Sequence, residues 1–301
     1  MSGESIALAK HIDLDKMEFP AYLSIKYDGV PVKLTVEMFH GTPHFKVVTR
    51  SHEIAHSVYK DMADFVEAND HLFLHNKLYT FVFETMHQTF TGFKDISGVV
   101  RRQTPQDGLT YNMFDFAVQD VDGPSTYTFD HRLFISNVFI FPPKFYRVKQ
   151  LRYDDKESLQ DALDNTLIAD DQEGWIIRAA NAMWKPGSRH WDYQKVVKEP
   201  TIDLWIIGME EGKGKFAGGV GKLIASYKGK EIGVGPGKQT TAERNELWQE
   251  WVQWQMAIRS GYKDTPWKRM AKIKHKPDEG YEALRQPTFQ CWRDDKTEAD
   301  A

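Results

Sequence analysis

Hydrophobic and polar residues alternate between residues 30 and 39, and this alternation predicts a β-strand. Apolar side chains occupy every second position there, at Val32, Leu34, Val36 and Met38. A period of two places them on one face of a strand, with the polar side chains on the other. The stretches "LYTFVFETM", "GLTYNMFDFAVQD" and "EGWIIRAA" are rich in aromatic and aliphatic residues and predict three further strands.

Three stretches have a helical period and predict α-helices at residues 53–68, 154–168 and 240–258. In each of them, apolar side chains three or four residues apart form one stripe. The stripes consist of Ile54, Val58, Met62 and Phe65; of Leu159, Leu163 and Leu167; and of Leu247, Trp251, Trp254 and Ile258. Thr240 and Glu243 form a capping-box pattern at the start of the third helix.

The composition changes at residues 199–203, "EPTID", and this change predicts a domain boundary. The 31 residues from Gly208 to Lys238 are rich in glycine and lysine, with six lysines and one acid, Glu231, between Lys213 and Lys238. We therefore expect two domains, residues 1–199 and residues 200–301. The second is expected to be a small β-barrel-like unit with one helix.

The bulk composition is that of a folded protein. The 301 residues are 41% apolar and 13% aromatic, with a net charge of -4, so binding to nucleic acid would require a local basic patch. The single cysteine, Cys291, excludes an internal disulfide and a cysteine-rich metal site. The absence of a signal-peptide pattern and of long apolar runs favours a soluble, cytoplasmic protein, and no feature indicates an oligomer.

Residues 23–34, "LSIKYDGVPVKL", carry an ammonium group and a carboxylate two residues apart, followed by a glycine. Alternation along a strand would place Lys26 and Asp28 on the same side. A surface ion pair beside a hairpin turn is one interpretation. The other is a lysine nucleophile. Its pKa of about 10.4 must be lowered by nearby cations and by desolvation before the amine attacks a phosphate.

Seven pieces, in order, resemble the ATP-dependent DNA ligases of the covalent nucleotidyltransferase superfamily. They are "KYDG", "VTRS", "FVFETM", "YNMFDFAVQDVDG", "EGWIIR", "KPGSRHWDYQKVVK" and "PTFQCWRDDK". The resemblance spans about residues 23–296. It implies an α+β fold, in which a nucleotidyltransferase domain of antiparallel sheets and flanking helices precedes a small OB-fold domain.

The resemblance assigns roles to individual residues. Lys26 is the adenylated lysine, Arg50 meets the nucleotide sugar or the nick phosphate, and Glu84 contacts the ribose. Phe114 stacks on adenine, Glu173 supports metal-dependent chemistry, and backbone groups such as those of Ile25 contribute to base recognition. The cations of the phosphate site are Lys195, Lys198, Arg293 and Lys296. The candidate metal or acid–base carboxylates are Asp28, Glu84 and Glu173. Taken alone, several of these residues also have a purely structural interpretation. Arg50 is then a solvated residue at a strand end, and Phe114 is an ordinary core residue.

The sequence departs from the family pattern at three places. Pro31 stands where an arginine is usual, and the nearby Lys33 could replace that cation. Ser24 stands where close phage relatives carry a glutamate that reads the adenine. Two residues, rather than one, separate Lys195 from Lys198, so the division of labour between the two lysines stays open.

The implied reaction has three steps. Lys26 attacks the α-phosphate of ATP in the presence of Mg²⁺, AMP passes to the 5′-phosphate of a nick in duplex DNA, and the 3′-hydroxyl displaces AMP. The second domain would grip the DNA backbone without reading sequence and would reorient between steps. About twenty residues precede "LSIKYDG", so the extra N-terminal domain of NAD-dependent ligases is not expected. The chain resembles a minimal ligase of bacteriophage or bacterial type that serves replication, repair or recombination.

Three other functions are compatible with parts of the same pattern. A GTP-dependent mRNA capping enzyme shares the lysine chemistry and the C-terminal motif, and an RNA ligase differs in its substrate. A non-catalytic DNA-binding module of OB type would need neither Lys26 nor Glu173, and the presence of both favours an enzyme.

Overall fold

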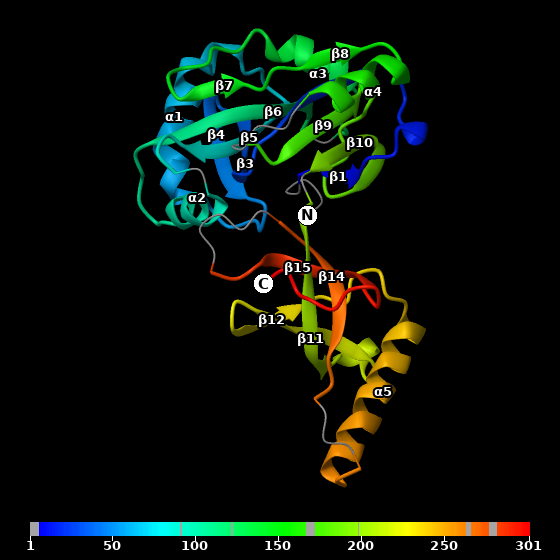
Figure 1. Cartoon of the computed structure of the whole chain (residues 1–301). Coiled ribbons are helices and arrows are strands. Elements are labelled where there is room, and N and C mark those ends of the chain that lie inside the picture. The colour runs from blue at the N-terminus through cyan, green and yellow to red at the C-terminus, as the bar shows by residue number, and fades with distance from the viewer. Residues whose placement is uncertain are drawn as a thin grey trace. The chain divides into compact units, whose positions relative to one another are not determined.

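The computed structural model describes residues 6–90, 92–121, 123–166, 172–197, 199–262, 266–276 and 282–301. The chain divides into two compact units, Met1–Val197 and Lys198–Ala301. Sheets predominate and a few helices flank them, so the expected mixed α+β class is confirmed (Figure 1).

One sheet of the first unit contains three of the predicted strands. Its order is β4-β3-β5-β6-β7, antiparallel except for the parallel pair β6 and β7. The strands are β3 (Val30–Phe39), β4 (Thr42–Thr49), β5 (Lys77–His87), β6 (Leu109–Asp120) and β7 (Phe145–Arg147). The alternation in β3 has the expected result, because Val32, Leu34 and Val36 are fully buried.

An aromatic core covers one face of this sheet. Phe65 from α1 (Tyr59–Ala68) packs edge-on against Phe81 and Phe83 of β5, with ring centroids 5.1 and 5.5 Å apart. The helix α2 (Phe93–Val100) contributes further buried side chains to the same core. Figure 1 shows α1 and α2 beside this sheet. Its opposite face is therefore available to polar groups.

Helix α1 begins later than the sequence predicts. Ile54, the first residue of the expected stripe, is 53% exposed, whereas Val58, Met62 and Phe65 are fully buried. Ile54 forms an isolated antiparallel bridge with Val48. Ile54 thus lies in a bridge to β4, and a 3-10 turn (His56–Val58) leads into α1, which removes Ile54 from the helical stripe.

A second sheet of the first unit carries the other predicted strand and has the order β1-β10-β9-β2-β8. The strands are β1 (Leu8–His11), β2 (Ala21–Lys26), β8 (Leu151–Tyr153), β9 (Gly174–Ala179) and β10 (Arg189–Val197). Leu23 and Ile177 form its core with Leu159 of α4 (Lys156–Asn165). Leu163 of the predicted stripe packs on this core, and Leu167 lies outside the described residues.

A buried ion cluster joins the polar faces of the two sheets. Asp115 on β6 pairs with Arg178 on β9 at 2.5 Å and with Arg132 on α3 (Phe129–Ser136) at 3.3 Å. All three side chains are at most 4% exposed. Because removal of one partner leaves a buried charge uncompensated, such a cluster is strongly sensitive to substitution.

The described residues of the second unit form an antiparallel sheet of order β13-β12-β11-β14-β15, with the α-helix α5 beside it. The strands are β11 (Thr201–Glu211), β12 (Val220–Tyr227), β13 (Lys230–Val234), β14 (Arg269–Lys276) and β15 (Arg285–Trp292). An isolated bridge joins Gly235, just after β13, to Thr288 of β15. The two edge strands are thus tied together, which curls the sheet toward a barrel.

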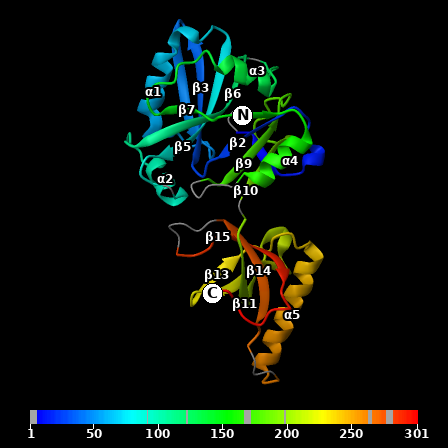
Figure 2. The same cartoon turned by 45° about the horizontal axis from the view of Figure 1, so that its top comes forward.

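Helix α5 (Thr241–Arg259) has the predicted capping box, because both Thr240–Glu243 bonds are present. Leu247 and Trp251 are buried in the core of the second unit, and α5 runs alongside its sheet in Figures 1 and 2. Neither α5 nor any other helix within the described ranges combines the length and apolarity that a membrane span requires.

Candidate active site

Lys26 is the last residue of β2, and its strand ends there. Tyr27, Asp28 and Gly29 form the connection to β3. The sequence analysis placed Lys26 and Asp28 on one side by assuming a continuous strand. The strand does not extend to Asp28, so that argument is wrong. Asp28 still acts electrostatically on Glu84, so its carboxylate belongs to the same neighbourhood.

Gly29 lies against the backbone of β5. A Cβ atom at this position would lie 2.3 Å from the carbonyl oxygen of Thr85 and 3.0 Å from Cγ of Glu84. No side chain fits there without backbone displacement. The glycine therefore brings the loop after Lys26 next to the strand that carries Glu84.

Glu173 holds Lys26 at two points. The carboxylate oxygen Oε2 of Glu173 accepts a hydrogen bond from Nζ of Lys26, and the backbone N–H of Glu173 donates to the Lys26 carbonyl oxygen at 2.9 Å. The side chains of Lys26 and Glu173 are 23% and 5% exposed. At Gly174, a Cβ atom would lie 1.9 Å from the Val196 carbonyl oxygen, so glycine is required after Glu173.

Glu84 faces away from the aromatic core, directly opposite Pro31 in the pairing of β5 with β3. Burial raises its pKa to about 7, although the charges of Lys26 and Arg50 oppose this shift. Arg50 follows the last residue of β4 and is exposed. The structure thus brings Lys26, Glu84, Glu173 and Arg50 into one electrostatic neighbourhood.

The pKa of Lys26 is raised in this structure, whereas nucleophilic attack requires it to be lowered. Burial lowers the pKa of the ammonium group, but the negative charges of Glu173 and Glu84 outweigh burial. The carboxylates of Glu173 and Glu84 therefore favour the protonated form of Lys26.

Lys33 lies on the face of β3 that also carries Pro31, because both alternate with Val32 and Leu34 of the core. Lys33 is only 2% exposed. The sequence left the orientation of Lys33 open. The structure places it on the face that carries Glu84, where a replacement for the usual arginine would have to lie.

Lys195 lies on the same face of its sheet as Lys26. Gly174 of β9 pairs with Lys26 on one side and with Val197 on the other, so Lys26, Lys195 and Val197 share a face by alternation. Val196 instead packs on the core of that sheet. Lys198, the other predicted lysine, lies outside the described residues.

The sequence interpretation missed Tyr193 and the role of Arg178 beside it. Tyr193 lies two residues before Lys195, bonds to Arg178, and acts electrostatically on Lys26. The Arg178 guanidinium lies 4.1 Å from the Tyr193 ring centroid. Both residues follow the period-two pattern of their strands, and this pattern could have identified them from the sequence.

Phe114 is the extra residue of a β-bulge. Val82 pairs with Asp115 and Phe83 with Met113, which leaves Phe114 without a partner residue in the β5–β6 ladder. Phe114 lies outside the aromatic core that contains Met113, and it lines a cavity of about 310 Å³. An ordinary core position is therefore wrong for Phe114.

The residues flanking Lys26 in β2 divide between the two faces. Ser24 shares the face of Lys26 and is 4% exposed, whereas Ile25 packs on the opposite face against the core. An adenine on the Lys26 side could reach only the backbone of Ile25. This placement agrees with the expected use of its main-chain groups.

The candidate metal ligands do not form a preassembled site. Within the described ranges, no group of three or more His, Cys, Asp or Glu side chains is arranged to hold a metal ion. Glu173 is instead engaged with Lys26. Mg²⁺ commonly uses one or two carboxylates together with substrate phosphates, so Glu84 and Glu173 fit such an ion only in the presence of nucleotide.

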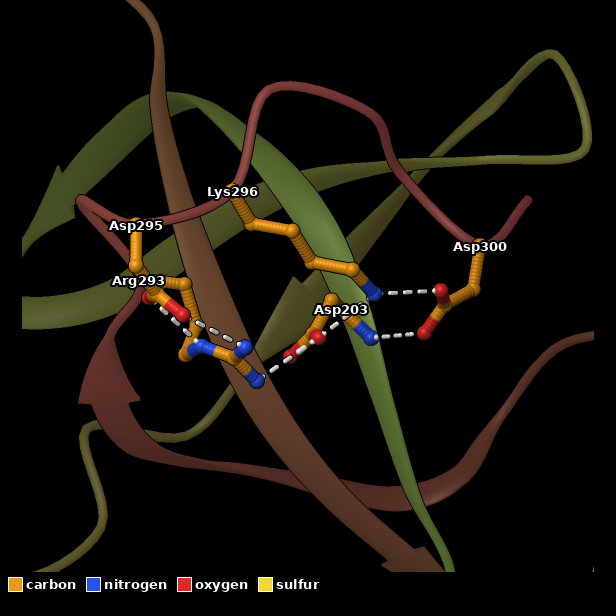
Figure 3. Close-up of polar contacts among 5 residues, drawn as sticks. All are labelled: Asp203, Arg293, Asp295, Lys296 and Asp300. Atoms are coloured by element: carbon orange, nitrogen blue, oxygen red, sulfur yellow. Dashed lines mark hydrogen bonds and ion pairs between the residues drawn. The ribbon is translucent and has the colours of Figure 1, made fainter.

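Arg293 and Lys296 belong to the second unit and converge on Asp203 of β11 (Figure 3). Arg293 Nη1 and Lys296 Nζ both donate to Oδ2 of Asp203, at 2.9 and 2.8 Å. Arg293 also holds Asp295, and Lys296 also holds Asp300. Carboxylates of the second unit thus fix both cations of the C-terminal motif.

No protein-family model and no curated protein matches this chain. Solved structures do resemble it. The structure named Pmar-Lig_Pre is 17% identical, with a TM-score of 0.73 and coverage of 97% of this chain and 68% of that chain. A Lig E DNA ligase, described as binding DNA with a minimal scaffold, is 19% identical, with a TM-score of 0.65 and coverage of 96% and 99%.

The ATP-dependent DNA ligase of bacteriophage T7, in complex with ATP, is 16% identical, with a TM-score of 0.50 and coverage of 97% of this chain and 99% of that chain. At such identities these likenesses establish the fold, and the chain shares the fold of these DNA ligases along nearly its whole length.

Proposed function

We propose that this protein is an ATP-dependent DNA ligase of the minimal two-domain type, which seals nicks in duplex DNA through a lysyl-AMP intermediate. The observation that carries the proposal is the placement of Lys26 at a strand end, in contact with Glu173 and in the field of Glu84. The family resemblance from residue 23 to residue 296 and the shared fold support it.

In the first step, Lys26 Nζ loses a proton and forms a bond to the α-phosphorus of ATP. The bond from that phosphorus to the bridging oxygen breaks, and pyrophosphate leaves with the electron pair. Glu173 contacts Nζ and is the nearest acceptor for the proton. Cationic charge from the nucleotide site would also lower the raised pKa of Lys26.

Mg²⁺ held by Glu84 and Glu173 with the phosphates would neutralise the charge that develops during this transfer. Binding of a cation by Glu173 would loosen the hold of that carboxylate on Lys26. The same carboxylates would then stabilise the ammonium group less, which would lower the pKa of Lys26.

The other side chains bind the nucleotide. Phe114 stacks on adenine, Glu84 contacts the sugar, and Arg50 meets the sugar or the nick phosphate. Main-chain groups of Ile25 contribute to recognition of the base. The cations that balance the phosphates are Lys195, Lys198, Arg293 and Lys296. The shared face of Lys195 and Lys26 supports this role for Lys195. Little covalent chemistry remains for the protein, so positioning and charge account for most of the rate.

The second unit would be an OB-fold domain that binds DNA. The bridge that ties β13 to β15 supports a closed barrel, and Lys213 and Lys215 are exposed before β12. Their charges would meet phosphates without reading the bases. The proposed working form is a monomer on nicked duplex DNA.

The proposal is tested by incubating the protein with ATP and Mg²⁺ on a nicked DNA duplex and on a nicked RNA duplex of the same sequence. Sealing of the DNA nick, lost in Lys26→Ala, is the expected result. Sealing of RNA alone would indicate an RNA ligase, and labelling by GTP alone would indicate a capping enzyme. DNA binding without any nucleotide transfer would indicate a non-catalytic module.

A further inference from the structure

The cations of the C-terminal motif are already engaged by carboxylates within their own unit. Asp295 occupies the Nε–Nη2 edge of the Arg293 guanidinium, at 2.9 and 2.8 Å, and Asp203 accepts from Nη1. Lys296 Nζ donates to Asp203 and to Asp300, at 2.8 and 2.7 Å. Charge-assisted bonds of this kind are those that a phosphate would also make.

The charges of this cluster do not favour an incoming polyphosphate. Two cations stand against three carboxylates, as Figure 3 shows, which leaves the five residues with one net negative charge. The fourth acid nearby, Asp294, is paired separately with Arg269 at 3.2 Å. A phosphate that binds Arg293 and Lys296 must therefore replace carboxylate contacts.

Asp203 is the fixed member of the cluster. It lies within β11 and is 5% exposed, and its backbone is tied to Asp300 through the bonds Asp203 N–H to Oδ2 and Asp300 N–H to the Asp203 carbonyl oxygen. Arg293 and Lys296 follow β15 on a turn closed by the bond from Lys296 N–H to the Arg293 carbonyl oxygen. Asp203 is therefore held by its strand and by Asp300, whereas Arg293 and Lys296 reach it from a turn.

We propose that Asp203 is a positioning residue that competes with the pyrophosphate group for Arg293 and Lys296, with Asp300 as its auxiliary. The inference rests on the proposed function, in which these cations bind the β- and γ-phosphates of ATP. In the absence of nucleotide, Asp203 holds the two cations together, so that both reach the phosphates of ATP as a pair. After adenylation, the same carboxylate recaptures them and promotes release of pyrophosphate.

The direct test is calorimetric titration of the full-length protein with magnesium pyrophosphate. Asp203→Asn removes the competing charge and keeps the size of the side chain, so pyrophosphate should bind about three- to tenfold more tightly. Asp300→Asn, at an exposed position, should shift affinity in the same direction by less. Weaker or unchanged binding in both variants would overturn the proposal and reduce Asp203 to a structural anchor.

Kinetics provide the second readout. Asp203→Asn should lower the KM for ATP in lysyl-AMP formation and lower the pyrophosphate concentration that strips AMP from the enzyme. Slower pyrophosphate release should reduce kcat wherever that release limits turnover. Sealing of a nick that already carries AMP should be unaffected, because that reaction involves no pyrophosphate.

Asp294→Asn is the matched control, since it removes a carboxylate of the same motif that pairs with Arg269 and not with Arg293 or Lys296. It should leave pyrophosphate affinity and KM unchanged. Circular dichroism and thermal unfolding of all three variants identify any loss of fold. If the wild-type protein forms no adenylate, the proposed function fails, and the calorimetric comparison still decides whether Asp203 competes with pyrophosphate.

Discussion

At the scale of single residues, the charge state of Glu84 near neutral pH depends on its surroundings. Burial raises its pKa to about 7 from an ordinary value of 4.5. A raised folded pKa means that the fold favours the protonated carboxyl. Its contribution to stability is therefore complete below pH 4.5 and is lost as pH rises through 7.

We predict that Glu84→Gln, which imitates the neutral carboxyl, gains stability relative to the wild type as pH rises. The two proteins should differ little near pH 4.5, and the variant should be more stable by ~2–3 kcal/mol above pH 8. Urea unfolding at several pH values measures the difference. Glu67→Gln, at an exposed position on α1, controls for loss of a carboxylate. A difference that stays constant with pH would contradict the account.

Short motifs were sufficient to predict Lys26, Glu84 and Glu173 as site residues. Lys26 ends β2, Glu84 lies within β5 and Glu173 directly precedes β9. It could not show that Glu173 holds the Lys26 ammonium, since 147 residues separate the two. Asp203 was missed for the same reason, because its partners Arg293 and Lys296 lie some 90 residues later. Contacts between segments that are distant in the sequence form only in the folded chain, so a local sequence pattern does not predict them.

At the scale of elements, the two sheets of the first unit are joined by the buried cluster of Asp115, Arg132 and Arg178. Asp115 directly follows Phe114 in the bulge of β6, and Arg178 lies four residues after Gly174 in β9. The cluster thus links the strand that carries the predicted adenine platform to the strand that begins after Glu173. Its integrity fixes the spacing of the nucleotide site.

We predict that Asp115→Asn destabilises the protein by about 3–5 kcal/mol, because two buried guanidinium groups lose their shared counter-charge. Chemical unfolding monitored by tryptophan fluorescence measures this loss. Asp120→Asn, on the same strand, breaks the exposed pair with Lys77 and should have little effect. Equal effects of the two substitutions would show that the cluster does not hold the sheets together.

Hydrophobic patterning predicted β3, β5, β6, β9 and α5, whereas the long strands β10 and β11 were not predicted individually. The start of α1 was wrong, since Ile54 pairs with Val48 in extended backbone and only resembles a helical position. The short helices α2 and α3 were not predicted. Arg132 interrupts the apolar pattern of α3, and its burial depends on Asp115 in another element.

At the scale of the whole molecule, the net charge of -4 conceals a local basic stretch in the second unit. Part of that stretch is neutralised internally, because Lys222 pairs with Glu210 and Lys230 with Glu282. Lys213 and Lys215 are exposed before β12. These two lysines are therefore the better candidates for contacts with DNA phosphates.

We predict that replacing both Lys213 and Lys215 by alanine weakens binding to nicked duplex DNA equally for all sequences. If each lysine neutralises one phosphate, the slope of log K against log salt should become shallower by about 1.8. Fluorescence anisotropy between low and physiological salt measures it. Lys60→Ala, on α1 of the first unit, is the control. An unchanged slope in the double variant would place the DNA contacts elsewhere.

The central claim is that Lys26 accepts AMP from ATP. Intact mass spectrometry of the full-length protein after incubation with ATP and Mg²⁺ tests it most directly. The account predicts a mass increase of one AMP in the wild type, reversed by pyrophosphate and absent in Lys26→Ala. The absence of any adduct, an adduct that persists in Lys26→Ala, or an adduct that forms only from GTP would contradict it.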